Sequence, residues 1–182
     1  MKTIISFISA IFIFIVTVNA QVSKINLQAS GLTCSMCSNA INKSLKTLSF
    51  IDNIKSNIKE SEFEIQIKPN SKVDFSAIKK KVEDAGFFVA KMEAIIDLQN
   101  INIENDAHIE FQGDVLHFMN VKPRLLNGMT QIRFLDKGYV SAKEYKKNST
   151  MTSMNCFRSG KTILCCEGKH QKAGQTLYHV TL

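Results

Sequence analysis

The sequence predicts an α+β protein: a ferredoxin-like βαββαβ domain over residues 22–97, followed by a small all-β domain, a barrel or a sandwich, over residues 98–182. Two observations support this prediction. The first half alternates strand-like and helix-like patterns, whereas the second half holds short strand patterns separated by turn residues. The length of 182 residues also fits one large or two small domains.

The first twenty residues have the pattern of a secretory signal peptide. Lys2 is the single charge, an apolar run follows it, and Val18-Asn19-Ala20 matches the site that a signal peptidase reads. We therefore expect residues 1–20 to be cleaved, and the mature protein to be secreted or periplasmic without stable membrane insertion. An uncleaved anchor is the alternative, because the apolar run is close to the minimum of roughly 17 residues that crosses a bilayer.

Six elements are predicted over residues 22–97, in the order strand, helix, strand, strand, helix, strand. Alternation of apolar and polar residues indicates the strands, and apolar residues spaced three and four apart indicate the helices. Asp74 is expected to cap the second helix, and Gly86 to end it. This order is that of the split βαβ motif, so both helices should cover one face of a four-stranded antiparallel sheet.

Residues 98–182 should contain five or six short strands. Strand patterns flank the turn signals Gly113-Asp114 and Asp136-Lys137-Gly138, which predicts two hairpins. A polar stretch at 143–153 is expected to be a loop or a short helix. The expected strands cover 107–111, 115–121, 130–135, 139–142, 161–166 and 175–182. Short strands joined by turns suggest a small barrel or sandwich.

The segment Cys34-Ser35-Met36-Cys37 lies between the first predicted strand and the first predicted helix. Cys37 would lie at the helix N-terminus, where free N–H groups and the helix dipole stabilise a thiolate. Two thiolates with no histidine or carboxylate nearby suit Cu(I), although Hg(II), Ag(I), Cd(II) or Zn(II) could also bind. A structural zinc site would need four ligands, and the chain has no second CxxC. We therefore predict an exposed two-thiolate metal site at Cys34 and Cys37.

The residues Gly31-Leu32-Thr33-Cys34-Ser35-Met36-Cys37 resemble the GMTCxxC signature of the heavy-metal-associated domain family, with Leu32 in place of methionine. This family includes copper chaperones, copper P-type ATPases and periplasmic mercury-binding proteins. The run Val82-Glu83-Asp84-Ala85-Gly86-Phe87 resembles the ending of the family's second helix. The resemblance covers residues 22–97. It implies that Cys34 and Cys37 are the ligands, that Met36 faces a partner, that Leu32 is buried under the loop, and that Phe87 either screens the metal or is simply a core aromatic.

These features together predict an exported metallochaperone. It would bind Cu(I) and pass it by ligand exchange to a protein partner, such as a metal-transporting ATPase or another metallochaperone. The alternatives are a periplasmic mercury scavenger of the same fold, a secreted adaptor with a metal-sensing domain, and a thiol oxidoreductase. The absence of tryptophan and the order of the elements argue against a thioredoxin-like oxidoreductase.

No other enzyme class or nucleic-acid partner is indicated. The sequence has no nucleophile elbow, P-loop or dinucleotide fingerprint, so we do not expect an enzyme. The 23 basic and 16 acidic residues give a net charge of +7, but the two signs alternate along most of the chain. Such a pattern is typical of a solvated surface and not of a nucleic-acid footprint.

The second half contains further groups that can bind metals. One hypothesis is a second copper site formed by residues 151–156 together with Cys165, Cys166 and His170. The favoured interpretation is a disulfide from Cys156 to Cys165 or Cys166, because adjacent cysteines rarely chelate one ion together and methionine is an ordinary core residue.

The remaining histidines carry weaker signals. His108 and His117 fall in strand patterns, where a hydrogen-bonded side chain is more common than a ligand, and His179 is expected on the surface.

Overall fold

The structure is a computed structural model, and it describes residues 21–32, 34–162 and 173–182. The predicted signal peptide at 1–20 therefore lies outside the described residues, as do Cys165, Cys166 and His170. None of the helices in the described ranges is long and apolar enough to cross a membrane.

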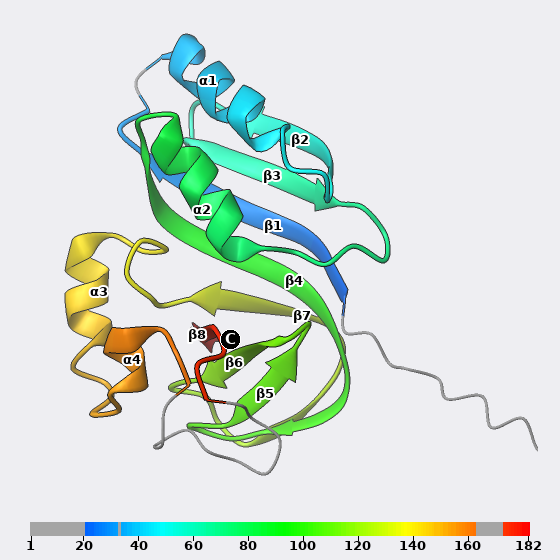
Figure 1. Ribbon diagram of the computed structural model, residues 1–182, viewed down its shortest axis with the longest axis vertical. Coiled ribbons are helices and arrows are strands. Elements are labelled where there is room, and N and C mark those ends of the chain that lie inside the picture. The colour runs from blue at the N-terminus through cyan, green and yellow to red at the C-terminus, as the bar shows by residue number, and fades with distance from the viewer. Residues whose placement is uncertain (1–20, 33, 163–172) are drawn as a thin grey trace, which may run out of the picture.

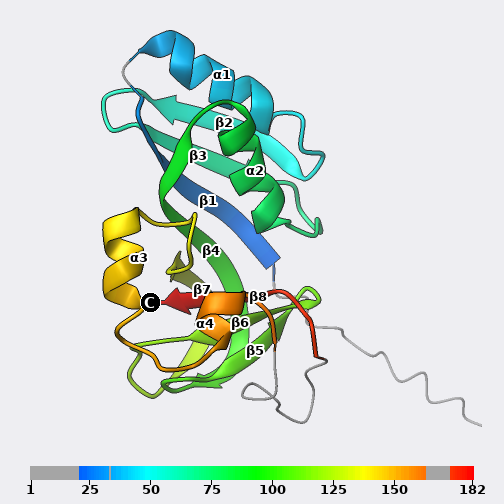
Figure 2. The same ribbon diagram turned by 60° about the vertical axis from the view of Figure 1, so that its left-hand side comes forward.

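The predicted order βαββαβ is confirmed in the first half. Its elements are β1 (Gln21–Ser30), α1 (Ser35–Leu45), β2 (Ile51–Asn57), β3 (Glu62–Ile67), α2 (Phe75–Asp84) and β4 (Phe88–Ile103). Helices α1 and α2 cover one face of the sheet, as Figures 1 and 2 show. Each helix buries a stripe of residues spaced three or four apart, because these positions share one helical face. The stripes are Ser38, Ile41 and Leu45 in α1, and Phe75, Ile78 and Val82 in α2.

The predicted ends of α2 are confirmed. The Asp74 carboxylate accepts a hydrogen bond from the Ala77 N–H at 2.9 Å, which satisfies one of the free N–H groups of the first turn. At the other end Gly86 has a φ of +86°, a left-handed conformation that favours glycine. The N–H groups of Gly86 and Phe87 donate to the carbonyls of Glu83 and Val82. This closing motif turns the chain directly into β4.

The second half extends the same sheet. Its elements are β5 (His108–Phe111), β6 (Asp114–Phe118), β7 (Arg124–Phe134), α3 (Ala142–Asn148), α4 (Cys156–Ser159) and β8 (Leu177–Thr181). All eight strands form one mixed sheet in the order β2-β3-β1-β4-β7-β8-β6-β5, in which β6 and β8 are parallel. Among the residues that the structure describes, the second half therefore neither closes into a barrel nor forms a separate sandwich, and it contains the helices α3 and α4.

Strand β4 explains this arrangement. It pairs with β1 through its first part and with β7 along most of its length, and it continues past residue 97 through an irregularity in the pairing between Leu98 and Ile101. Figure 1 shows β4 curving from the two-helix half into the rest of the sheet. The expected boundary between residues 97 and 98 falls inside this strand.

One predicted hairpin of the second half is confirmed and the other is wrong. Strands β5 and β6 form the first, with its turn at Gln112-Gly113 instead of Gly113-Asp114. The expected strand at 139–142 does not form. Ser141 instead caps α3, because its hydroxyl accepts a hydrogen bond from the Glu144 N–H at 3.3 Å. Residues 163–166 of a further expected strand lie outside the described residues.

Candidate metal centre

The two cysteines of the predicted site lie where β1 meets α1. Cys34 is the N-cap of the helix, and its sulfur accepts a hydrogen bond from the Cys37 N–H at 3.3 Å. Capping groups with a lone pair satisfy N–H groups that have no partner within the helix. The same hydrogen bond that starts α1 therefore holds the two cysteines of the motif close together.

The electrostatics at this position favour a thiolate. Hydrogen bonds from the Cys37 side chain and from the Cys37 backbone N–H lower the pKa of the Cys34 thiol. The helix dipole acts in the same direction at a helix N-terminus. A lowered thiol pKa raises the thiolate fraction, and the thiolate is the form that binds soft metals.

Solvent and a partner protein can both reach the loop. Cys34 is exposed and Cys37 is half-buried. Between them, the Met36 side chain is 81% exposed, which agrees with the expectation that it points outward. A metal held by this pair would lie at the surface and not inside the core.

Two apolar residues support the loop from below. Leu32 is only partly buried, but it packs against the core as the resemblance implied. Phe87 is also partly buried and packed against the core. A Cβ placed on Gly31 would lie 4.0 Å from the Phe87 ring, so this ring lies under the turn that precedes the cysteines. The closing motif of α2 therefore places Phe87 at the base of the loop that carries Cys34 and Cys37.

A βαββαβ unit with one exposed and one half-buried cysteine at the start of its first helix defines a class of small soft-metal-binding domains. The comparison with protein families places the chain more closely. The model of the heavy-metal-associated domain matches residues 26–88. The chain belongs to the heavy-metal-associated domain family through this part of its length.

Several solved structures are similar to this part of the chain. The CopZ metallochaperone is 26% identical, with 37% of this chain and 100% of that chain covered and a TM-score of 0.35. A candidate copper-ion-binding protein from Bacillus anthracis is 30% identical, with 38% and 96% covered and a TM-score of 0.35. Oxidised MerP from Ralstonia metallidurans is 17% identical, with 38% and 96% covered and a TM-score of 0.35. Among curated proteins, none is a significant match.

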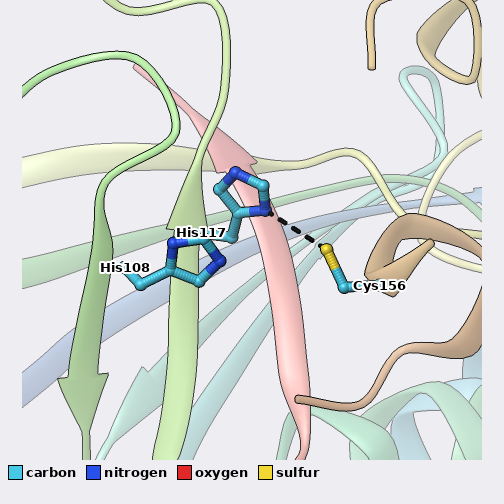
Figure 3. Close-up of side chains that lie close together, drawn as sticks. All are labelled: His108, His117 and Cys156. Carbon is cyan, nitrogen blue, oxygen red and sulfur yellow. Dashed lines mark hydrogen bonds between the residues drawn. The ribbon is translucent and has the colours of Figure 1, made fainter. Parts of the chain in front are cut away.

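The structure also brings together residues that the sequence did not connect. His108 and His117 lie opposite each other in β5 and β6, and Cys156 of α4 lies beside them (Figure 3). Burial, followed by the neighbouring His108 and His179, lowers the pKa of His117 to about 4, so its ring is neutral at pH 7. His179 is fully buried, contrary to the expectation that it lies on the surface.

Proposed function

We propose that this protein is an exported carrier of Cu(I), which binds the ion between Cys34 and Cys37 and passes it on by ligand exchange. One observation carries the proposal: an exposed Cys34 caps α1 and is hydrogen-bonded to Cys37. Two converging thiolates without a nitrogen or oxygen donor favour a soft monovalent ion.

Transfer follows from the exposure of the site. A thiolate on a partner protein would attack the bound Cu(I) and form a three-coordinate intermediate. One chain thiolate then leaves the ion and takes up a proton. A second partner thiolate displaces the other chain thiolate in the same way, so the partner ends with Cu(I) between two thiolates and the oxidation state of copper does not change. The partner class is a protein with its own thiolate site, such as a metal-transporting ATPase or a second metallochaperone. Met36, which is 81% exposed beside the ligands, would form part of the surface that the partner contacts.

An anaerobic titration of the reduced full chain with Cu(I), in competition with a chromophoric chelator, tests the ligands. We expect the Cys34→Ser/Cys37→Ser variant to lose one equivalent of tightly bound Cu(I). The matched control is Ser35→Ala, which changes the same exposed loop and keeps both thiols. Equal binding by the double variant and the control would overturn the assignment. If the chain binds Hg(II) but cannot take Cu(I) from the chelator, the result would instead support a mercury scavenger.

Export has a separate test. The pattern of Val18-Asn19-Ala20 predicts cleavage after Ala20. When the full chain is expressed in a bacterium, we expect the periplasmic fraction to hold a protein whose N-terminal residue is Gln21. Recovery of the chain with residues 1–20 intact, in the membrane fraction only, would contradict the proposal of a cleaved signal.

A further inference from the structure

A second group of metal-binding side chains lies in the other half of the molecule, away from the cysteine loop. The candidate ligand atoms of His108, His117 and Cys156 all lie within 4.8 Å of one another. The two imidazole rings stack with their centres 4.1 Å apart, and the Cys156 sulfur lies 3.8 Å from His117 Nδ1. Figure 3 shows both rings on neighbouring strands with the cysteine beside them. Three donors from three elements therefore converge on one volume.

Asp106 orients both rings. Its backbone carbonyl lies 2.8 Å from His108 Nδ1, so that nitrogen carries the proton and donates it. Its carboxylate lies 3.1 Å from His117 Nε2, which donates in the same way. Each neutral ring is then left with one unprotonated nitrogen, which is Nε2 in His108 and Nδ1 in His117. Metal-binding histidines commonly have their second nitrogen held by a carboxylate or a carbonyl in this manner.

The burial of these groups points to a ligand and not to a simple hydrogen-bonded pair. His117 and Cys156 are completely buried. His108 Nε2 is also buried, and it has no hydrogen-bond partner among the described residues. A buried polar atom without a partner is destabilising, and a bound metal ion would remove that penalty. The surrounding apolar side chains, Val115 and Leu177, exclude water from the sulfur.

We propose that His108, His117 and Cys156 form a second metal site, which binds a copper ion. Two imidazoles and one thiolate in a trigonal set are a donor combination that copper accepts. Structural zinc sites take four ligands, and the described residues bring three donors together. Met154 packs against the cluster that contains Cys156. Copper sites of this kind accept a weak thioether as an additional ligand, which is a role that Met154 could take. His179 is a neighbour, with its ring centre 4.8 Å from that of His117, but its nitrogens lie outside the group of three donors.

This second site does not depend on the proposed role of the loop that carries Cys34 and Cys37. Its test therefore starts from the full chain carrying Cys34→Ser/Cys37→Ser, in which the loop can no longer bind. We expect this protein to take up one equivalent of Cu(I) anaerobically, with X-ray absorption showing two nitrogen neighbours and one sulfur neighbour. Adding Cys156→Ala or His108→Phe should abolish the binding. Asp106→Ala should weaken it by roughly 10–100-fold, the usual effect of removing a group that orients a metal-binding histidine.

The matched control is Cys165→Ser/Cys166→Ser in the same background, which removes two other thiols and should leave the Cu(I) equivalent in place. Circular dichroism and the urea midpoint confirm that each variant is folded, and His108→Phe keeps most of the stacking volume because a phenyl ring replaces the imidazole. The proposal is overturned if the starting protein binds no Cu(I), or if folded Cys156→Ala and His108→Phe variants bind as before. It is also overturned if the control variant loses the ion, or if Zn(II) displaces Cu(I) from the site.

Discussion

At the scale of single residues, the cysteine that would bind metal also starts a helix. Cys34 has extended backbone angles and accepts the hydrogen bond from the Cys37 N–H. Asp74 does the same for α2, through its carboxylate and the Ala77 N–H. A sulfur is a weaker acceptor than an oxygen, whereas serine is among the preferred N-cap residues. The position of Cys34 is therefore explained better by its thiol chemistry than by capping alone.

This argument predicts that Cys34→Ser leaves the stability of the metal-free protein within about 0.5 kcal/mol of its original value, because the hydroxyl replaces the sulfur as the cap. Asp74→Ala, in contrast, should lower the free energy of unfolding by about 1 kcal/mol, because nothing replaces the lost acceptor. Urea unfolding under reducing, metal-free conditions measures both. A loss from Cys34→Ser as large as that from Asp74→Ala would mean that the sulfur is needed for the fold itself.

At the scale of elements, the C-terminal strand β8 pairs with β6 through four residue pairs, but its other edge has little regular pairing. Strands β7 and β8 share only two residue pairs in the described part of the chain, Arg133 with Thr181 and Phe134 with Val180. The buried Asp136 continues this junction. Its two carboxylate oxygens bond the backbone N–H and the ring Nδ1 of His179, both at 2.7 Å. The Asp136 carboxylate thus accepts hydrogen bonds from β8 where the backbone pairing of β7 with β8 ends.

We expect Asp136→Ala to destabilise the protein by about 2–3 kcal/mol, because it leaves a buried N–H and a buried imidazole nitrogen without their acceptor. The control is Asp52→Ala, since Asp52 is an exposed carboxylate in β2. Substitutions at such surface positions usually change stability by no more than about 0.5 kcal/mol. Urea midpoints of the two variants measure the difference, and equal midpoints would show that the Asp136 contacts are dispensable.

The elements also show which parts of the fold were predictable. Alternation in the strands, the caps of α2 and the spacing of Cys34 and Cys37 are local signals, and local signals determine most of the βαββαβ half. The signal for the start of α3 was also local, because Ser141 and Glu144 have the S-x-x-E spacing of a capping box. The strand pattern predicted for 139–142 obscured this signal. Long-range pairing, such as that of β6 with β8, has no such local signal.

The group of His108, His117 and Cys156 shows that local signals also cannot predict all of a site. Its two histidines face each other because the turn lies at Gln112-Gly113, and a turn one residue later would have paired His108 with Met119. Only two of the three donors, the histidines, could thus be brought together from hairpin geometry. Cys156 comes from a short helix 39 positions beyond His117, and its approach depends on tertiary packing.

At the scale of the whole molecule, one hydrophobic core joins the metal-binding half to the rest. Phe75 of α2 contacts both Phe134 of β7 and Tyr178 of β8, with ring centres 4.7 and 5.4 Å apart. Residues of β1, α1 and β3 belong to the same buried cluster as residues of β6, β7 and β8. The two halves therefore share side-chain packing as well as strand β4, and we expect them to lose structure together.

Phe134→Ala tests this coupling. Phe134 is completely buried, and removing a buried phenylalanine ring typically costs about 3–5 kcal/mol through lost burial and the cavity that remains. Because the core is shared, hydrogen exchange should accelerate in β1 and β3 of the metal-binding half as well as in β6 and β8 near the substitution. Phe88→Ala is the matched control, since that ring is 69% exposed and its loss should have little effect. Mass spectrometry of exchange resolves the strands separately. Faster exchange confined to β6, β7 and β8, with β1 and β3 unchanged, would show that the metal-binding half is stable on its own, and that β4 connects two independent folding units.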